Sequence, residues 1–298
     1  MNTRKGIILA GGNAKRLYPL TYSVSKQLMP VYDKPMIYYP LSTLMLAGIK
    51  EYLVIVNPIH LDAFKSLLGD GKKWGISIEY AIQKKPEGLA QAFLIAEDFI
   101  DNKSSVLILG DNLYHGNDLI PQLLKANQQE KGATIFVYPV SDPERYGVAE
   151  FNNNKKVINL EEKPKYPKSN YAVTGIYFFD NTAVFKAKNI KPSSRGELEI
   201  TCLNNLFLKE NNLFVEIMGR GMAWLDTGTF DSLHQAGTYI RLLERRQGLK
   251  VGCPEEIAWR NKWIDDQDLI KLAENMMKSG YGEYLIKTQK DPFYQNLI

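Results

Sequence analysis

The apolar run and glycine turn GIILAGGNAKRL at residues 6–17 decide the fold at the start of the chain. The run at 6–10 predicts a buried strand, and Gly11 and Gly12 predict a tight turn directly after it. Lys15 and Arg16 follow this turn. Because glycines let backbone N–H groups approach an anion closely, and the two cations offset negative charge, the stretch predicts a phosphate-binding turn. Its spacing is neither that of the P-loop nor that of the dinucleotide fingerprint.

Short β-rich runs recur after this first strand and alternate with helical patterns. We expect strands at 52–57, 76–83, 106–110 and 133–140, and helices at 36–47, 61–68, 89–100 and 119–128. This alternation predicts an α/β fold with a doubly wound, mostly parallel, Rossmann-like sheet. Ligands of such sheets bind beyond the carboxyl ends of the strands, so the residues at those ends are candidates for a site.

The pattern of expected helices and strands changes near residue 141 and again near residue 230. Between these points, β-rich segments at 146–151, 156–161, 171–179 and 213–218 stand beside helical stretches at 183–189 and 200–210. After 229 we expect helices at 230–246, 254–263 and 267–278. The interpretation is a core of residues 1–229, made of the halves 1–140 and 141–229, with a C-terminal helical part at 230–298.

The composition is that of an ordinary globular protein, with 298 residues of which 45% are hydrophobic and 23% charged. The net charge of +4 is mild and its cations are scattered, which gives little support for nucleic-acid binding. Cys202 and Cys253 stand far apart without a metal-type spacing, as expected in a reducing cytoplasm. The run at 6–10 is too short for a signal peptide or a membrane span. We therefore expect a cytoplasmic protein with neither a nucleic-acid nor a membrane partner.

Two carboxylates are candidates for a metal site. Asp111 directly follows an apolar run, which predicts that it lies at the carboxyl edge of the sheet and presents oxygen ligands to Mg²⁺. Asp226 stands in WLDTGT at 224–229, which we interpret as a turn that folds back onto this edge. Taken alone, Asp111 is equally consistent with a helix cap, and the sequence leaves the proximity of the two carboxylates open.

Several longer motifs resemble the bacterial glucose-1-phosphate thymidylyltransferases, a family of sugar nucleotidyltransferases. The likeness runs along nearly the whole chain and is carried by SKQLMP at 25–30, YDKPMIYYP at 32–40, PEGLAQA at 86–92, LGDN at 109–112, DPERYGV at 142–148, LEEKP at 160–164, RGELEIT at 195–201 and WLDTGT at 224–229.

The resemblance implies a magnesium-dependent reaction of dTTP with α-D-glucose 1-phosphate, giving dTDP-glucose and pyrophosphate for deoxysugar synthesis of the dTDP-rhamnose type, as in lipopolysaccharide. It implies that a sugar-phosphate oxygen attacks the α-phosphorus in line, without a protein nucleophile. Such transfer depends on positioning and charge neutralisation, and no nucleophile-elbow or Cys/His signature is apparent in the sequence. The halves 1–140 and 141–229 then become the nucleotide-binding and sugar-binding halves.

The resemblance also assigns residues by motif. Arg16 and Lys26 would neutralise the triphosphate, Lys163 and Arg195 would hold the sugar phosphate, and the two aspartates would bind Mg²⁺. The nucleotide site would contain Gly11, Gly12, Lys26, Gln27, Gln83, Gly88, Asp111 and Asn112, where the Gln83 amide reads the pyrimidine and a side chain at Gly88 would collide with it. The hexose would be surrounded by Tyr146, Gly147, Glu162, Val173 and Trp224. Glu197 and Glu199 stay unplaced, because they share one face of a strand but diverge on a helix.

The likeness continues in RRQGLKV at 245–251 and CPEEIAWR at 253–260. In the family this region helps to build a homotetramer, a dimer of dimers, and a second site at which a dTDP-sugar acts as feedback inhibitor. Gly116, Glu256 and Arg260 are the candidates for that allosteric site. An amphipathic helix buried in a subunit contact explains the same residues.

One departure from the family pattern falls in the phosphate turn, where relatives usually have Gly and Thr at the positions of Ala14 and Lys15. If position 14 needs a positive φ, its methyl group costs roughly 1 kcal/mol. Two other functions therefore stay open. One is a pyrophosphorylase that uses UTP or another hexose 1-phosphate, and the other is a nucleotide-sugar-binding regulator with impaired turnover. The missing dinucleotide spacing argues against a nicotinamide oxidoreductase.

Overall fold

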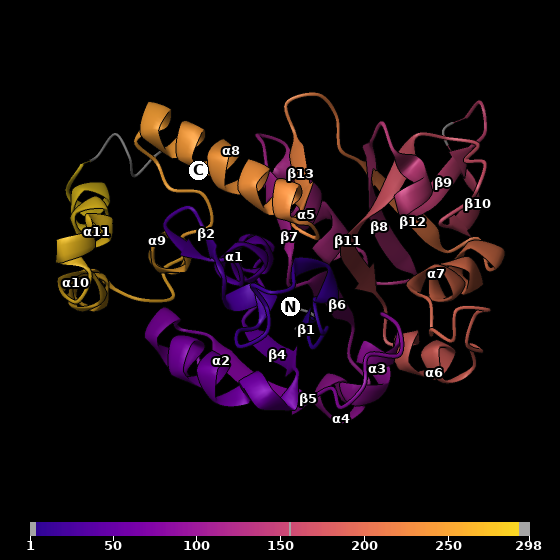
Figure 1. The fold of residues 1–298 in the computed structure, drawn as a ribbon, viewed down its shortest axis with the longest axis horizontal. Coiled ribbons are helices and arrows are strands. Elements are labelled where there is room, and N and C mark those ends of the chain that lie inside the picture. Colours follow the sequence, from indigo (N-terminus) through magenta and orange to yellow (C-terminus); the bar gives the residue numbers. More distant parts are fainter. Residues whose placement is uncertain (1–3, 155, 292–298) are drawn as a thin grey trace.

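The computed structural model describes residues 4–154 and 156–291. In these residues the chain forms a mixed nine-stranded sheet in the order β10-β9-β11-β6-β1-β4-β5, with β8 and β12 joined to it at β11 (Figure 1). Its parallel part contains β1 (Lys5–Ala10), β4 (Glu51–Val56), β5 (Ser77–Ile82) and β6 (Ser105–Leu109). The antiparallel part is built around β11 (Tyr171–Phe179), with β8 (Ala133–Pro139), β9 (Gly147–Phe151) and β10 (Val157–Glu162), while β12 (Leu213–Ile217) lies parallel to β8.

Alternate residues of the parallel strands enter two separate cores, which is why these strands are apolar throughout. In β1, Ile8 packs into one core, and Ile7 and Leu9 pack into the other. The first core is covered by α1 (Tyr38–Leu46), α2 (Leu61–Leu68) and α5 (Leu119–Gln128). The second is covered by α3 (Gln91–Ile95), α4 (Glu97–Ile100), α6 (Ala183–Lys188) and α7 (Ile200–Lys209). The predicted α/β class with a doubly wound, Rossmann-like sheet is confirmed.

A small second sheet, which the sequence did not predict, positions part of the site. It pairs β7 (Asn112–His115) antiparallel to β13 (Ala223–Asp226), with Asp226 opposite Asn112. The predicted turn at WLDTGT is therefore wrong in part, because residues 224–226 are strand. A further short pair joins β2 (Pro30–Val31) to β3 (Lys34–Pro35).

The C-terminal helices extend to one end of the molecule, opposite α6 and α7 (Figure 1). They are α8 (Phe230–Gln247), α9 (Pro254–Arg260), α10 (Asp266–Glu274) and α11 (Tyr281–Lys290). A capping box between Thr229 and Ser232 fixes the start of α8. The sequence missed α11, and the expected helix at 89–100 divides at Ala96. Residues 292–298 of the proposed C-terminal part lie outside the described residues.

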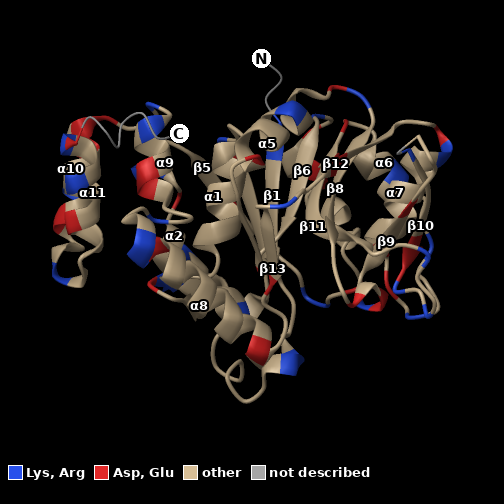
Figure 2. Ribbon diagram, turned by 90° about the horizontal axis from the view of Figure 1, so that it is seen from above, with Lys and Arg blue, Asp and Glu red and all other residues tan. Residues whose placement is uncertain are grey.

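Shorter 3-10 turns at Lys15–Leu17, Lys26–Leu28 and Pro143–Arg145 carry side chains into the site described below. Both signs of charge occur on α8 and on α9 (Figure 2). Over the described ranges, the structure contains no helix that combines the length and the apolar character needed to cross a bilayer.

Candidate active site

A cleft of about 780 Å³ lies beyond the carboxyl ends of β1 and β6 and between the two halves of the predicted core. It is lined by residues from widely separated segments. Most of the side chains predicted from the sequence are among them: Gly12, Arg16, Gln27, Gln83, Gly88, Asp111, Asn112, Tyr146, Gly147, Glu162, Lys163, Val173, Arg195, Trp224 and Asp226. Gly11 and Lys26 do not line the cleft, but both contact residues that do.

Two carboxylates come together at the end of β6. Asp111 follows this strand, and the Thr227 amide and hydroxyl donate to the Asp111 carbonyl oxygen at 3.2 and 2.8 Å, which holds the end of β13 beside it. Burial, and then the negative charge of Asp111, raise the pKa of the Asp226 carboxyl. Facing carboxylates of this kind fit one hard divalent cation, whose charge would relieve their repulsion.

The donor set around this pair is small. In the described part of the chain, no group of three or more His, Cys, Asp or Glu side chains could hold a metal ion. A cation bound by Asp111 and Asp226 would therefore take its remaining ligands from water and from substrate oxygens, as magnesium commonly does in phosphate-transfer sites.

Lys26 and Asn112 fix the Asp111 carboxylate from beneath the cleft. The buried Lys26 ammonium forms an ion pair with Asp111 Oδ2. Burial by itself would raise the pKa of Asp111, but the Lys26 charge and the hydrogen bonds from Lys26 and Asn112 together outweigh it, so this pKa is lowered. Asn112 donates to Asp111 Oδ1 at 2.9 Å and accepts from Trp224 Nε1 at 2.6 Å. The Asn112 amide therefore joins Asp111 to the aromatic side of the cleft.

The phosphate turn has the left-handed residue that the sequence left in question. Ala14 has φ 46° and ψ 37°, a conformation that favours glycine. A side chain at Gly11 would meet Gln83, since its Cβ would lie 2.2 Å from Gln83 Oε1, whereas Gly12 opens into free space at the cleft. Arg16 lines the cleft, and the exposed Lys15 does not.

The structure gives a different reason for glycine at position 88 from the one the sequence suggested. Gly88 has φ 107°, and a Cβ there would lie 2.4 Å from the Leu198 carbonyl oxygen. The chain's own backbone therefore excludes a side chain, without any collision with a ligand. Gln83 is 2% exposed, and its amide nitrogen donates to Gln91 Oε1 at 2.7 Å.

The opposite end of the cleft contains two cations among three carboxylates. Arg195 donates to Glu199 Oε1 from Nε at 3.1 Å and from Nη2 at 2.7 Å, and its Nη2 also lies 3.3 Å from Glu162 and 3.4 Å from Glu197. Burial lowers the pKa of Arg195, but the hydrogen bond to Glu199 and the charges of the three carboxylates raise it overall. Lys163 Nζ lies 3.8 Å from Glu162 Oε1.

Glu197 and Glu199, which the sequence left unplaced, both line this cleft, because the backbone at Glu199 is extended before α7 begins. Sequence reasoning missed Thr201 and Tyr177, which also line it. Thr201 Oγ1 donates to Glu162 Oε2 at 2.5 Å. The RGELEIT motif was the signal that could have found Thr201.

An aromatic wall separates the two charged ends. The rings of Tyr146 and Trp224 pack edge to face with centroids 5.1 Å apart. At Gly147, an added Cβ would lie 3.1 Å from Thr201 Oγ1 and 3.3 Å from Glu162 Oε2, so glycine leaves room for this hydrogen-bonded pair.

A separate cavity of about 200 Å³ contains all three predicted allosteric residues, Gly116, Glu256 and Arg260. Arg260 Nε donates to Glu256 Oε1 at 2.8 Å, while Arg260 Nη2 is buried without a hydrogen-bond partner in the described residues. Because a buried donor is costly to leave unpaired, this nitrogen fits an acceptor oxygen of a ligand.

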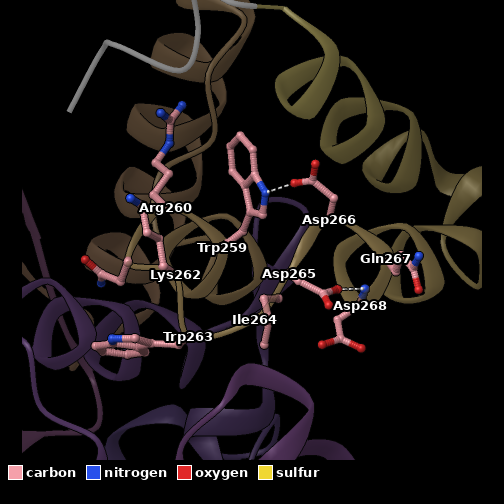
Figure 3. A pocket seen from close by; sticks show the side chains of 10 residues that line it. Trp259, Arg260, Lys262, Trp263, Ile264, Asp265, Asp266, Gln267 and Asp268 are labelled. Atoms are coloured by element: carbon pink, nitrogen blue, oxygen red, sulfur yellow. Dashed lines mark hydrogen bonds between the residues drawn. The ribbon is translucent and has the colours of Figure 1, made fainter.

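Another hollow, of about 1120 Å³, lies elsewhere and is lined by residues 259–268 between α9 and α10 (Figure 3). Its polar side chains serve local structure: Trp259 Nε1 donates to Asp266 at 2.6 Å, and Asp265 caps α10 (Figure 3). None of the predicted catalytic residues lies there. The convergence of charged groups therefore identifies the cleft of about 780 Å³ as the candidate active site.

Comparison with known proteins identifies relatives along almost the full chain. A model of the nucleotidyl transferase family matches residues 5–241. A glucose-1-phosphate thymidylyltransferase of Xanthomonas campestris pv. campestris (strain B100) is 57% identical over 290 residues, covering 97% of this chain and 98% of the relative. A relative of the same name from Neisseria meningitidis serogroup A is 56% identical over 286 residues, covering 96% of this chain and 99% of the relative.

Solved structures show the same relationship. A Bacillus anthracis protein described as a glucose-1-phosphate thymidylyltransferase, in complex with sucrose, matches with a TM-score of 0.74 and 44% identity over 80% of this chain and 95% of that chain. A UDP-glucose pyrophosphorylase complexed with UDP-glucose matches with a TM-score of 0.70 and 22% identity over 80% of this chain and 99% of that chain. The latter similarity shows the fold alone.

The acid pair predicts opposite effects of two isosteric substitutions on stability. The folded pKa of Asp226 is raised, so its ionised form destabilises the ligand-free fold at neutral pH, and this cost vanishes as pH falls through the folded pKa. Asp226→Asn should therefore raise the Tm at pH 7, with a gain that shrinks toward acidic pH. Thermal unfolding followed by circular dichroism between pH 4 and pH 8 measures this.

Asp111→Asn should lower the Tm instead. Its folded pKa is lowered, so its contribution is present above the unfolded pKa and lost as pH falls through the folded one. The substitution leaves the Lys26 ammonium buried without its partner, which costs on the order of 2 kcal/mol because the Asp111 side chain is still 21% exposed. If the Tm of both variants moved in the same direction, the opposite pKa shifts of Asp111 and Asp226 would be contradicted.

The left-handed backbone at Ala14 predicts that Ala14→Gly stabilises the protein. Relief of the steric strain outweighs the extra chain entropy of glycine, leaving a gain of about 0.5–1 kcal/mol in chemical denaturation. Ala187→Gly, in the last turn of α6, where the backbone is right-handed, is the control and should destabilise instead. An equal loss in the free energy of unfolding in the two variants would show that the backbone at Ala14 is unstrained.

Proposed function

Because the chain belongs to the nucleotidyl transferase family, and within it to the glucose-1-phosphate thymidylyltransferases, we propose that it joins dTTP to α-D-glucose 1-phosphate, forming dTDP-glucose and pyrophosphate. The product would feed deoxysugar synthesis of the dTDP-rhamnose type, as used in lipopolysaccharide. The relatives carry the name of this reaction, and the cleft of this chain contains the charged groups that the reaction needs.

One observation supports the proposal most strongly. Asp111 and Asp226, which are 115 positions apart in the sequence, meet in one cleft that Arg16, Lys163 and Arg195 also line. A reaction between two phosphate esters needs its charges neutralised and its reacting atoms aligned, and it requires no protein nucleophile. The arrangement matches these demands.

In the proposed mechanism, an oxygen of the sugar phosphate attacks the α-phosphorus of dTTP. The bond from this phosphorus to the bridging oxygen of the β-phosphate breaks, and pyrophosphate leaves with the electron pair. Arg16 binds the triphosphate from the phosphate turn, and backbone N–H groups at Gly11 and Gly12 approach it closely. Lys26 holds Asp111 in place and adds positive charge beneath the reacting phosphates.

We propose Mg²⁺ as the cofactor, held by Asp111 and Asp226. When bound, it supplies Lewis-acid charge that neutralises phosphate oxygens. The two carboxylates fit this ion because burial and then the charge of Asp111 disfavour the ionised form of Asp226, and a cation would offset both effects. Asn112 orients Asp111 toward it through the 2.9 Å hydrogen bond.

The sugar end would recognise the hexose through hydroxyl-accepting carboxylates and the aromatic wall. Glu162 is fixed by Thr201 and faces the space that Gly147 leaves open. Lys163 lines the same end and would bind the sugar's phosphate together with Arg195. Since Arg195 already pairs with Glu199, its positive charge is partly compensated there.

We further propose that the protein works in the cytoplasm as a homotetramer and that dTDP-sugars inhibit it at the cavity around Gly116, Glu256 and Arg260. The unpaired Arg260 nitrogen supports this second site. The sequence motif GLAQA at 88–92 resembles that of the thymidylyl enzymes more than that of the uridylyl enzymes, which favours thymidine nucleotides in the cleft.

An assay of pyrophosphate release across dTTP, dCTP, UTP and several hexose 1-phosphates tests the main proposal. We expect the largest kcat/KM with dTTP and glucose 1-phosphate, loss of turnover on chelation with EDTA, and recovery on adding excess Mg²⁺. A larger value with UTP would favour the uridylyl alternative. Tight binding of dTDP-glucose in calorimetry without release from any pair would favour a regulator.

A substitution at Arg260 tests the proposed regulatory site. Arg260→Lys keeps the positive charge but loses the planar fork of donors, so inhibition by dTDP-rhamnose should weaken about tenfold while uninhibited kcat stays near the wild-type value. Inhibition curves at fixed substrate concentrations measure it. An unchanged inhibition constant would place the inhibitor elsewhere, and competitive inhibition against dTTP alone would point to the main cleft.

A further inference from the structure

Besides Arg16, Lys163 and Arg195, a fourth cation lines the cleft. Arg145 ends the 3-10 turn Pro143–Arg145 just before β9, and its guanidinium lies over the Tyr146 ring at 5.3 Å from the centroid. Tyr146 in turn packs against Trp224 in the aromatic wall. Arg145 therefore enters the cleft from the sugar-binding half, opposite the phosphate turn.

The ion pair that holds Arg145 is exposed and easily exchanged. Its Nη1 donates to Asp142 Oδ2 at 2.6 Å, and the two side chains are 41% and 39% exposed. Exposed pairs of this kind contribute little to stability, so a more highly charged anion can replace Asp142 at small cost. A guanidinium has five N–H donors in a planar fork, and this bond uses one of them.

Arg145 lines the same cleft as Asp226. The charges of Lys26, Arg16 and Arg145 all act on the Asp226 carboxyl and oppose the rise in its pKa that burial and Asp111 cause. The Tyr146 hydroxyl is influenced in the same way: burial and then Asp226 raise its pKa, while Arg145 and Arg16 lower it. Arg16 and Arg145, which come from different halves of the chain, therefore line one cleft together with Tyr146 and Asp226.

The balance of charge in the cleft shows why another cation is needed. Without Arg145, the charged side chains that line or touch the cleft in the described residues are four cations, Arg16, Lys26, Lys163 and Arg195, and five carboxylates, Asp111, Glu162, Glu197, Glu199 and Asp226. A triphosphate and a sugar phosphate add further negative charge, and three of the carboxylates already surround Arg195.

We propose that Arg145 is a phosphate-binding residue of the active site. Asp142 holds it in the ligand-free protein, and it moves to donate to the phosphate oxygens of the nucleoside triphosphate, facing Arg16. This inference rests on the proposed nucleotidyl transfer. It assigns the Arg145 charge to the triphosphate and pyrophosphate side of the reaction, and Asp142 becomes a competing anion that the substrate displaces.

Steady-state kinetics of the full chain test the assignment. Arg145→Gln should lower kcat/KM for dTTP by about tenfold or more, as expected for one lost charge-assisted contact, with a smaller change in the KM for glucose 1-phosphate. The kcat/KM of Arg145→Lys for dTTP should lie between those of the wild type and Arg145→Gln, since lysine restores the charge without the planar fork of donors. Arg241→Gln, which removes the same charge from an exposed position in α8, is the control and should match the wild type.

Asp142→Asn separates this role from a structural one. If Arg145 only anchors its loop through the ion pair, Asp142→Asn and Arg145→Gln should lose activity alike. The proposal requires Asp142→Asn to keep or increase kcat/KM for dTTP, because the competing anion is gone. Arg145→Gln kinetics equal to those of Arg241→Gln, or a large rise in the glucose 1-phosphate KM alone, would overturn it.

The two levels of the proposal can fail separately. Absence of turnover in the wild-type protein would count against the proposed function. In that case calorimetric titration with dTTP still decides the role of Arg145: weaker binding by Arg145→Gln than by Arg241→Gln supports it, and equal binding overturns it. Matching circular dichroism spectra and melting temperatures of the variants show that each is folded.

Discussion

The pairing of β13 with β7 is the constraint on which the site depends. Asp111 stands at the end of β6, as the doubly wound topology requires, but Asp226 reaches it only because Asp226 lies opposite Asn112 in this two-stranded sheet. Thr227 closes the arrangement by donating twice to the Asp111 carbonyl oxygen. The two carboxylates are thereby held together, and burial and then the charge of Asp111 raise the pKa of Asp226. Such strain is what a site that binds a divalent cation is expected to contain in its ligand-free form.

The rest of the cleft extends from this acid pair in two directions. Toward the phosphate turn, Lys26 stabilises Asp111 and Arg16 lines the opening. Toward residues 141–229, Asn112 contacts Trp224, Trp224 contacts Tyr146, and Tyr146 contacts Arg145. The acid pair and the aromatic wall therefore form one hydrogen-bonded and packed unit, so a change in either is expected to affect the other.

The sequence predicted those features that depend on local pattern. Apolar runs predicted β1, β4 and β6, because buried strands need nearly continuous hydrophobic residues. It did not predict β7 and β13, since four-residue strands carry too little periodicity, and it placed Asp226 in a turn. Motif resemblance identified the cleft residues, but it could not show that Gly88 is required by the Leu198 backbone, because this contact joins segments more than 100 residues apart. The break between α3 and α4 at Ala96 and the helix α11 were likewise not predicted from the sequence.

The central claim is that Asp111 and Asp226 act as one site for a divalent cation. Counting bound Mn²⁺ in the presence of dTTP, by electron paramagnetic resonance of the free ion, tests it most directly. The structure predicts one tightly held ion per chain, lost in both Asp111→Asn and Asp226→Asn and retained in Asp231→Asn, a control at an exposed position of α8. Undiminished Mn²⁺ binding in either cleft variant would contradict the account.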